Sequence, residues 1–389
     1  MDPDMEREGA RIDREHSRLG SWLCDAAYPL WSTRGVDPAG GFHERLAQDG
    51  TPLAEARRSR VNPRQAYCFA MAPSLGWRGD AAALVRHGLD YFLARYRRPD
   101  GLFRTLVNAD GSSRDERALL YDQAFALLAF NVAAGIGDAR AERERHAIEL
   151  RALVLERMKR AGPGFESGVP SSLPLQSNPH MHLFEATLAG CEVCSESSLW
   201  KPLADEIAEL ALTRFIDARS GTLREFFDAD WNPAPGVEGR IVEPGHQFEW
   251  AWLLLRWSES KHGAPHARAQ AAAFKLIEVG ETHGVRNGLA TNSLLDDFSP
   301  HDAGARLWPQ TERLKAAALA ARLTGDARYF TIAAAAAESL GRYLETPLPG
   351  LWFDRIDAHG TVVDEPAPAS SFYHLVAAIA ELSALARLA

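Results

Sequence analysis

Residues 242–257 of this 389-residue chain read VEPGHQFEWAWLLLRW. Beyond the turn at Pro244 and Gly245 the segment is apolar on nearly every side, which predicts a helix buried inside the protein. His246 and Glu249 stand three positions apart, so they would share one side of its first turn. Because a titratable pair among apolar neighbours is costly unless it is hydrogen-bonded or used, we interpret this pair as a candidate functional site.

Segments of this kind recur along the chain. Six apolar segments open with a loop or an acidic residue and carry polar groups in their first turn, at residues 60–72, 118–130, 175–189, 242–254, 306–320 and 367–380. One polar residue from each gives gaps of 58 to 64 residues: Arg64, Asp122, His182, His246, Gln310 and His374. Amphipathic segments with apolar residues three and four apart lie between them, at residues 81–96, 139–159, 203–215, 266–281 and 327–344.

This periodicity predicts an all-α fold. An internal repeat decides the architecture before other signals do, and six pairs of one amphipathic and one apolar helix can close into a ring. Short ribbon-like runs, such as GLFRTLVNADGSS at residues 101–113, precede several of the apolar segments. We therefore predict an (α/α)6 barrel of six helical hairpins, with short β-ribbon loops at the active-site end. It would be a single domain of residues 1–389 with about ten frayed residues at the N-terminus.

The composition excludes several classes of protein. A net charge of −9 and an isoelectric point near 5.8 argue against a nucleic-acid partner. No apolar run reaches the length of a membrane span, and the charged N-terminus lacks a signal-peptide core. Four cysteines in a chain of this length predict no disulfide framework. We therefore expect a cytoplasmic protein that binds neither nucleic acid nor membrane, and the oligomeric state stays open, with a homodimer as one option.

Closure of the ring would bring the first turns of the apolar helices together at one end. The polar residues that would meet there are Arg64, His182, Glu185, His246, Glu249, Glu312 and His374. The aromatic residues that would form the wall of this cleft are Tyr121, Trp231, Trp308, Trp352, Phe372 and Tyr373. A funnel of aromatic side chains with a few converging charges is typical of a small-molecule site and suits a sugar. On this ground Glu312 is counted among the substrate-binding residues.

Structural interpretations stay open beside the functional one. Glu249 could favour the helix dipole and His246 could cap the helix, but the dipole contributes only a few tenths to about one kcal/mol. His374 follows two serines that can cap a helix, so a structural histidine is the alternative there. Arg64 could form an ion pair with Glu249 or Glu312 instead of holding a sugar oxygen.

A metal site is another use for such groups, and the pattern does not favour one. Dimetal helix bundles use Glu-x-x-His, whereas the steps at His182 and at His246 have the opposite order. The chain has no His-Glu-x-x-His motif, no phosphate-binding loop and no dinucleotide-binding glycine motif. His180 would point roughly 200° away from His182 on a helix, so we favour a structural role for it. We therefore expect no metal and no cofactor.

Four segments together resemble motifs of the N-acylglucosamine 2-epimerase superfamily. They are SNPHMHLFEA from residue 177, EPGHQFEWAWLL from residue 243, RLWPQTERLKA from residue 306 and PASSFYHLVAAIAEL from residue 368. The resemblance extends from Arg64 to His374. Within the superfamily, EPGHQFEWAWLLLRW and LWFDRIDAHGTVVDEPAPASSFYH are most similar to the bacterial D-mannose isomerases, which convert mannose to fructose. The resemblance implies an (α/α)6 barrel and metal-independent chemistry at C1 and C2 of a free reducing sugar.

The resemblance also implies roles for individual residues. His246 and His374 match two acid/base histidines, and Arg64 matches an arginine that stabilises the oxygens of an enediol. The positions that match further contacts to the sugar or to a histidine are Asn178, His182, Glu249, Trp308 and Trp352.

The implied chemistry is proton transfer between neighbouring carbons. A base would remove the proton on C2 of the open-chain aldose, and Arg64 with a protonated histidine would neutralise the cis-enediolate. Return of the proton to C1 gives a ketose, whereas return to the other face of C2 gives an epimer. A 2-epimerase of the mannose/glucose, N-acylglucosamine or cellobiose type is therefore the alternative. A more distant one is a glycoside hydrolase, whose paired acids would come from Asp228, Asp230, Glu249 and Glu312.

Overall fold

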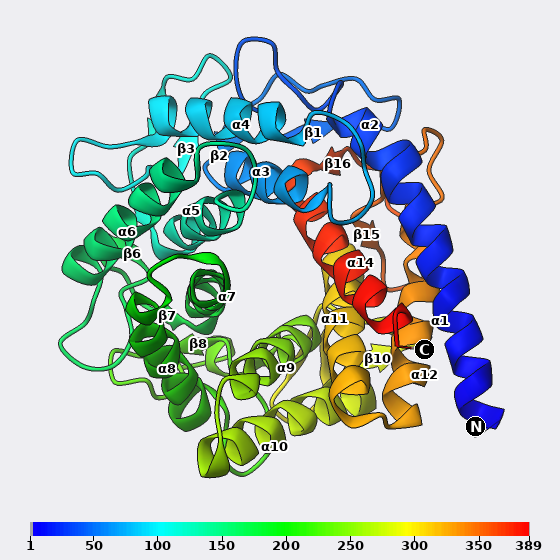
Figure 1. Cartoon of the computed structure of the whole chain (residues 1–389). Helices are drawn as coiled ribbons and strands as arrows, with labels where there is room; N and C mark the ends of the chain where they lie inside the picture. Colours follow the sequence, from blue (N-terminus) through cyan, green and yellow to red (C-terminus); the bar gives the residue numbers. More distant parts are fainter. Residues whose placement is uncertain (1–2, 389) are drawn as a thin grey trace.

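Inner and outer helices alternate along the chain and close into a ring (Figure 1). The computed structural model describes residues 3–388. The inner helices are α3 (Val61–Met71), α5 (Leu120–Ala133), α7 (Ser177–Val193), α9 (Pro244–Glu259), α11 (Leu307–Thr324) and α14 (Phe372–Ala386). The outer helices are α1 (Pro3–Ser21), α4 (Ala81–Tyr96), α6 (Arg140–Arg157), α8 (Lys201–Leu210), α10 (Gly263–Val279) and α12 (Ala327–Ser339). The predicted (α/α)6 barrel is confirmed.

Burial separates the two sets of helices as the sequence pattern predicted. In α11 every residue from 309 to 321 is buried, and many of them are alanines that allow close approach of neighbouring helices. In α10 only five residues are buried, and four of them follow a spacing of three and four: Ala269, Ala273, Leu276 and Ile277, with Val279 at the end of the helix. Short helical segments complete the ring: η1 (Trp22–Ala27), α2 (Tyr28–Trp31), η2 (Ser197–Leu199), η3 (Ala211–Phe215), η4 (Glu238–Arg240), η5 (Gly280–Gly284), α13 (Gly341–Leu344) and η6 (Ala369–Ser371).

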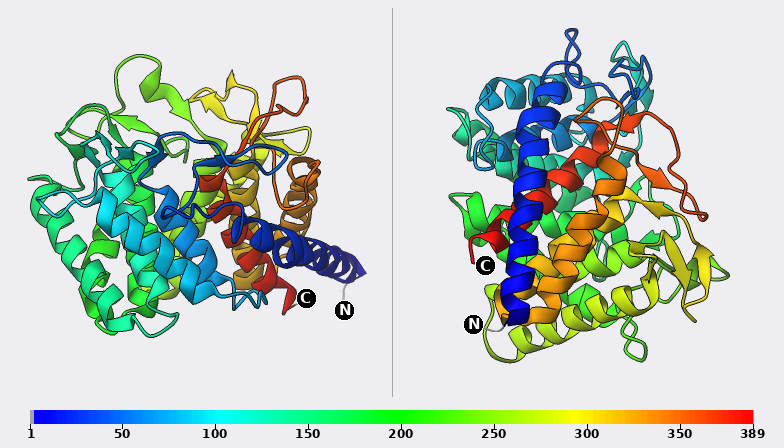
Figure 2. Two further views of the ribbon diagram at one scale, coloured as in Figure 1. Left: turned by 90° about the horizontal axis from the view of Figure 1, so that it is seen from above. Right: turned by 90° about the vertical axis from the view of Figure 1, so that its right-hand side faces the viewer.

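Short antiparallel ladders link the hairpins at one end of the ring (Figure 2, left). Their strands are β1 (Arg45–Leu46), β2 (Arg57–Arg58), β3 (Leu106–Val107), β4 (Ser113–Asp115), β5 (Ala118–Leu119), β6 (Gly168–Val169), β7 (Leu175–Gln176), β8 (Phe226–Phe227), β9 (Ile241–Val242), β12 (Ser293–Leu295), β13 (Pro300–Asp302), β14 (Ala305–Arg306), β15 (Arg355–Ile356) and β16 (Ala367–Pro368). A further hairpin joins β10 (Val285–Arg286) to β11 (Leu289–Ala290). The strand before each inner helix pairs with a ribbon of the next unit, and β16 with β1 closes the circle.

A repeated hydrogen bond holds five of the ribbons against inner helices α3, α5, α7, α9 and α11. The Phe103 and Leu223 backbone N–H groups donate to the side-chain oxygens of Gln123 and Gln247, at 2.9 and 2.8 Å. The same bond recurs from Phe42 to Asn62, from Phe165 to His180 and from Ala290 to Gln310. These side chains replace the partners that buried ribbon amides would otherwise lack. His180 therefore has the structural role that we favoured, and Gln310 serves the ribbon rather than a site.

The N-terminal segment corrects one expectation. Instead of fraying over about ten residues, the chain is helical from Pro3, and α1 lies along α12 (Figure 2, right). Arg11 forms two hydrogen bonds with Glu338, at 3.0 and 2.7 Å, while Ile12 and Leu19 are fully buried. These contacts fix a segment whose own sequence looked merely charged. Residues 1 and 2 lie outside the described part of the chain.

The expectation that no apolar run reaches the length of a membrane span was wrong, because residues 369–386 are long and apolar enough to cross a membrane. They form η6 and α14, and 72% of this window is buried inside the structure. In Figure 1, α14 lies among the inner helices of the ring. The apolar character of this segment is therefore explained by its place in the core.

Candidate active site

A polar cavity of about 250 Å³ lies at the ribbon end, where the first turns of the inner helices meet. It is smaller than pockets for drug-sized ligands, which are roughly 300–1,000 Å³. Seven of the nine predicted site residues line it: Arg64, Asn178, His182, His246, Glu249, Trp308 and His374. Tyr121, which the sequence predicted in the aromatic wall, lines it too. The remaining lining residues, which the sequence did not single out for this role, are Arg58, Arg60, Glu243, Arg306, Ser370 and Ser371.

His246 is anchored by a carboxylate from a ribbon. Its Nδ1 lies 2.8 Å from Glu225 Oε2, and Glu243 Oε2 lies 3.5 Å from the same nitrogen. Burial lowers the pKa of His246, but Glu225 and Glu243 outweigh it and raise the pKa to about 10. The imidazole is therefore protonated near neutral pH. With Nδ1 engaged, Nε2 is the nitrogen left for a ligand in the cavity.

Trp308 lies between the two predicted catalytic histidines. Its ring centroid is 4.9 Å from that of His246 and 6.0 Å from that of His374. A Cβ at Gly245 would come within 2.4 Å of the Trp308 ring, so the absence of a side chain there lets the indole lie against the first turn of α9. The sequence around His246 thus positions Trp308 as well.

His374 is also held through its Nδ1 by a carboxylate, which here comes from an inner helix. Its Nδ1 lies 2.8 Å from Glu312 Oε1, one turn before Lys315 on α11. Lys315 Nζ lies 2.6 Å from the other oxygen of Glu312. Burial lowers the pKa of His374 well below its usual value, and the charges of Arg64 and Lys315 add to that effect. This imidazole is therefore neutral at neutral pH.

Arg64 projects from the first turn of α3 into the same cavity. Its guanidinium donates to the Ser370 carbonyl oxygen at 2.9 Å and to the Tyr121 hydroxyl at 2.6 Å. It also lies 4.0 Å from the centre of the Phe125 ring. Among the described residues Arg64 forms no ion pair with a carboxylate, so the alternative pairing with Glu249 or Glu312 is wrong. A buried guanidinium without an anionic partner is suited to an oxyanion.

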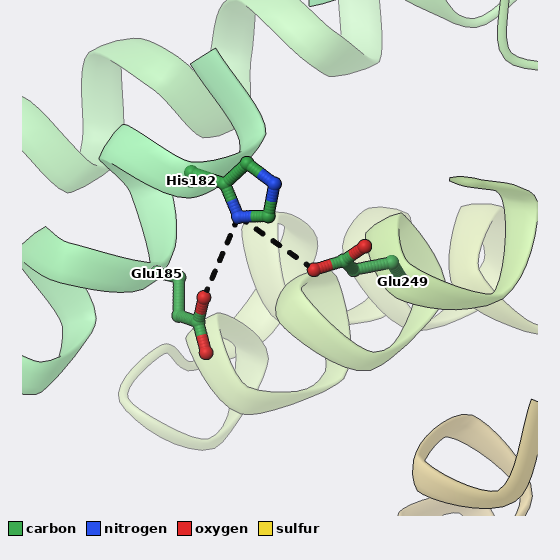
Figure 3. A group of neighbouring side chains, drawn as sticks. All are labelled: His182, Glu185 and Glu249. Carbon is green, nitrogen blue, oxygen red and sulfur yellow. Dashed lines mark ion pairs between the residues drawn. The ribbon is translucent and has the colours of Figure 1, made fainter. Parts of the chain in front are cut away.

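His182, Glu185 and Glu249 form a third group, shown in Figure 3. His182 Nδ1 points between the two carboxylates, 3.7 Å from Glu185 Oε2 and 3.8 Å from Glu249 Oε1. Burial lowers the pKa of His182 to about 3, against the opposing effect of Glu185. Burial also raises the pKa of Glu249 well above its usual value, with nearby Glu312 adding to the rise. The spacing of His246 and Glu249 suggested that they form a pair, but the partner of His246 is Glu225, and Glu249 lies beside His182.

Several buried polar atoms of this cavity have no hydrogen-bond partner within residues 3–388. They are Asn178 Oδ1, His182 Nδ1, both carboxyl oxygens of Glu249, and Arg64 Nε. Buried polar atoms are normally paired, so a cluster of such atoms in one cavity calls for an explanation. A ligand with several hydroxyl groups would supply both donors and acceptors to them.

Two groups of residues have the atom types of a metal site. Their ligand atoms lie within 4.8 Å of one another in the sets His182, Glu185, Glu249 and Glu225, Glu243, His246. In the first set Tyr373 donates to Glu185, and the positive charge of Lys315 acts on both carboxyls. In the second the imidazole is protonated, and a metal requires its neutral form. In both sets a positive charge of the protein, on Lys315 or on the imidazolium of His246, already lies near the carboxylates.

Two predicted site residues lie outside the cavity. Trp352, expected in the aromatic wall, is fully buried and stacks between Trp31 and Phe372, with ring centroids at 4.9 and 5.6 Å. The indole therefore fills the core between α2 and α14. Glu312 lies behind His374 and is fully buried. Its contact with a substrate is therefore indirect, through the imidazole.

Glu225 is the functional residue that sequence reasoning missed. It lies two residues before the ribbon residue Phe227, which pairs with Leu175. The same place in the other ribbons holds buried polar residues as well: Glu44, Thr105, Ser167, Ser293 and Asp354. A buried polar residue that recurs with the period of the fold was the available signal.

A wider opening of about 570 Å³ adjoins the cavity and shares Arg58, Arg306 and Ser370 with it. The arginines on its wall are each paired with an acid: Arg45 with Glu55, Arg58 with Glu44, Arg306 with Asp354 and Arg355 with Glu365. This vestibule is therefore polar but carries little excess charge.

Comparison with known proteins places this architecture. A family model described as N-acylglucosamine 2-epimerase (GlcNAc 2-epimerase) matches residues 40–378. A mannose-6-phosphate isomerase of Rhizobium meliloti (strain 1021) is 50% identical over 382 residues, which cover 96% of this chain and 98% of the relative. A D-mannose isomerase of Thermobifida fusca is 27% identical over 369 residues, which cover 86% and 89%. The structure of cellobiose 2-epimerase from Spirochaeta thermophila DSM 6192 has the same fold, with a TM-score of 0.84, 21% identity and coverage of 97% and 98%.

Proposed function

The chain belongs to the N-acylglucosamine 2-epimerase family, and from this premise we propose that it interconverts an unphosphorylated aldose and its ketose, D-mannose and D-fructose. It is an enzyme, as the sequence predicted, because its relatives are sugar isomerases and epimerases. One observation carries the proposal: two imidazoles of opposite protonation state face one small cavity on either side of Trp308.

The proposed reaction moves one proton from C2 to C1 of the open-chain sugar. Nε2 of neutral His374 takes the proton from C2, the C–H electron pair forms the C1–C2 double bond, and the carbonyl electrons move onto O1. His246 donates its Nε2 proton to O1, and Arg64 stabilises the charge that develops on the enediolate. His374 then returns its proton to C1 while O2 gives its proton to His246, which yields the ketose.

The remaining polar residues suit the hydroxyl groups of the sugar. In the described part of the chain, Glu249, His182 and Asn178 present buried atoms that have no hydrogen-bond partner, and each such atom can bind a hydroxyl. Trp308 offers an apolar surface for the sugar ring or chain. Metal-independent chemistry is part of the proposal, since the imidazoles and Arg64 provide both proton transfer and charge stabilisation.

Incubation of the purified protein in heavy water with mannose, glucose, N-acetylglucosamine and cellobiose tests the proposal. We expect fructose from mannose, followed by NMR, with deuterium at C1 wherever the proton held by His374 exchanges with solvent before its return to C1, and at most traces of fructose with His374→Asn. Deuterium at C2 of an epimer would instead support the 2-epimerase alternative. Cleavage of cellobiose would support a hydrolase, and no turnover of any sugar would contradict an enzyme of this class.

Mannose 6-phosphate is a second candidate substrate. A relative with 50% identity is named for it, and Arg58 and Arg306 lie where the cavity meets the vestibule. We place the free sugar first because both arginines already pair with acids, Glu44 and Asp354. The same heavy-water assay with mannose 6-phosphate decides. A kcat/KM above that for mannose, lost in Arg306→Gln, would reverse the order.

Dialysis against a chelator tests the metal-free mechanism. We expect isomerase activity to be unchanged after treatment, because the proposed steps use only protein side chains. Clear loss of activity that zinc or manganese restores would contradict this part of the proposal, and the His182 and Glu225 groups would then be the places to look.

A further inference from the structure

The two histidine–carboxylate pairs have the same contact distance, but the charged residue next to each pair differs. In each pair Nδ1 lies 2.8 Å from a glutamate oxygen, Glu225 for His246 and Glu312 for His374. The third charged group is an acid, Glu243, in the first pair and a base, Lys315, in the second. Because the first contacts match, a difference in proton affinity between the imidazoles must come from groups beyond them.

Lys315 is placed to act on His374 without contacting a substrate. It is fully buried and does not line the cavity. Its Nζ lies 2.6 Å from Glu312 Oε2 and 3.7 Å from the centre of the Trp252 ring. An ammonium is expensive to bury, and these two contacts offset part of that cost. Burial raises the pKa of Glu312, and Lys315 opposes the rise, so Lys315 favours the ionised form of the partner of His374.

Glu243 has the opposite position relative to His246. It precedes α9 as its N-cap residue and lies on the cavity wall. Its Oε2 is 3.5 Å from His246 Nδ1, so that imidazole faces two carboxylates. Burial raises the pKa of Glu243 to about 7 against the effect of His246, so its negative charge develops as the pH passes neutrality. A negative charge beside His246 then helps to retain the imidazole proton in alkaline solution.

We propose that Lys315 and Glu243 are positioning residues that impose opposite protonation states on His374 and His246 and so decide which histidine is the base and which the acid. The inference deepens the proposed function, and its kinetic consequence rests on it. Without Lys315 the His374–Glu312 pair would attract a proton as the other pair does. Both histidines would then be protonated near neutral pH, and no base would remain.

The other charged groups that face the two rings are consistent with this assignment. Those that act on His374 or line the same cavity come from α3, α7, α9 and β14: Arg64, His182, Glu185, Glu249 and Arg306. Of these, Arg64 and Arg306 oppose protonation, Glu185 favours it, and the raised pKa of Glu249 reduces its charge. Around His246 the remaining charged neighbours are Glu225, Glu249 and, through Glu243, Arg306.

Histidine titration in the unmodified protein is the first test, and it is independent of the sugar. The protein is labelled with ¹³C at histidine Cε1, and its 13 histidine signals are followed by NMR from acid to alkaline pH. Spectra of His246→Asn and His374→Asn assign the two signals. We expect one ring to stay neutral to well below pH 6.5 and the other to stay protonated to about pH 10. Titration of both between pH 6 and pH 7 would overturn the proposal.

Three variants test which residues cause the difference. Lys315→Met keeps the volume and removes the charge, and we expect the His374 transition to rise by at least about one pH unit, a tenfold change in proton affinity. The acidic limb of kcat/KM should move by the same amount, and Lys315→Arg should restore it. Glu243→Gln should move the His246 transition and the basic limb down, and leave His374 in place.

Arg256→Met is the matched control. It removes another cation that lies over Trp252, at 4.6 Å, but this cation pairs with Glu192 and is not among the main charges that act on His246 or His374. We expect both histidine transitions to keep their place in this variant. Unchanged transitions in Lys315→Met and Glu243→Gln, or equal shifts in Arg256→Met, would overturn the proposal. Should Lys315→Met not fold, the wild-type titration and Glu243→Gln decide. Absence of sugar turnover would contradict the proposed function alone, because the NMR titrations do not depend on it.

Discussion

Helices α7 and α9 carry the same His-x-x-Glu step, yet their histidines have different partners. In α7, His182 Nδ1 lies 3.7 Å from Glu185 on its own helix and makes no hydrogen bond within residues 3–388. In α9, His246 forms a 2.8 Å contact with Glu225 from a ribbon. Identical spacing within a helix therefore leads to one ring without a charged hydrogen-bond partner and one that holds a proton.

The position of each histidine on its helix and the ribbon that covers it together account for this difference. His180 and Gln247 accept the same ribbon N–H bond, so His182 lies two residues after that position and His246 one residue before it. Ser167 and Glu225 occupy equivalent places, since their carbonyl oxygens accept from Leu120 N and Ser177 N at 3.0 and 3.1 Å. The ribbon thus offers a hydroxyl near α7 and a carboxylate near α9. A hydroxyl cannot compensate the charge of an imidazolium, whereas a carboxylate does so at short range. The hydrogen-bond partner of a buried histidine therefore comes from another element of the fold, and the sequence of its own helix does not reveal it.

Replacement of the two histidines gives the largest expected contrast. His246→Asn, like His374→Asn, should lower kcat by roughly 10³-fold, because general acid–base catalysis contributes about 10²–10⁴-fold. His182→Asn should act mainly on KM, because a neutral imidazole that is not hydrogen-bonded to a carboxylate is expected to bind a sugar hydroxyl rather than to transfer a proton. Steady-state kinetics with mannose measures both. Equal losses of kcat in His182→Asn and His246→Asn would break the distinction, and circular dichroism controls for folding.

Removal of the ribbon carboxylate should have the next largest effect. Glu225→Gln keeps the shape of the side chain but removes the negative charge that raises the pKa of His246. We expect kcat/KM at neutral pH to fall by roughly 10²-fold. The matched control is Ser167→Ala at the equivalent place beside α7, which should change kcat/KM by less than about threefold, within the range of a single neutral hydrogen bond. A similar loss in both variants would show that the ribbon acts through stability alone.

The pH profile of the unmodified enzyme follows from the two protonation states. His374 must be neutral, so activity should fall about tenfold per pH unit only below its depressed pKa. His246 must be protonated, so the fall on the alkaline side should begin near its pKa of about 10. We therefore expect a plateau of kcat/KM from below pH 6.5 to near pH 10. A narrow optimum centred on pH 6.5 would contradict the assignment of the two rings.

Glu249 should give the smallest change. The raised pKa favours its neutral form, which an amide resembles, so Glu249→Gln should lower kcat/KM by no more than roughly tenfold, as expected for one or two hydrogen bonds. The effect should fall on KM, since both oxygens are free to bind the sugar. A loss of kcat as large as that of Glu225→Gln would instead make Glu249 the charged partner in catalysis.

Much of the fold could be predicted because its signals repeat. Six apolar segments with matching first turns require a buried ring of helices, and the structure has them. The predicted N-terminal fraying was wrong because the ion pair of Arg11 with Glu338 joins segments more than three hundred residues apart. No local pattern near Arg11 reveals that contact.

For the candidate site, too, some residues could be predicted from the sequence and others could not. The first turns of the inner helices brought Arg64, His182, His246 and His374 together as predicted, because ring closure places all helix starts at one end. The position of Trp352 was not predictable, because a ribbon residue turns toward the cleft or toward the core according to its neighbours, here Trp31 and Phe372. Glu225 was overlooked because its ribbon carried no helical period.

The sequence by itself determined the ring, the end at which polar groups converge and the presence of two histidines there, since these follow from periodic burial of apolar surface. The tertiary structure alone decided the state of each histidine. Glu225 and Glu243 surround one ring with negative charge, whereas Lys315 and Arg64 bring positive charge to the other. Proton affinity in a buried site depends on charges within a few ångströms, and distance along the chain does not reveal which charges those are.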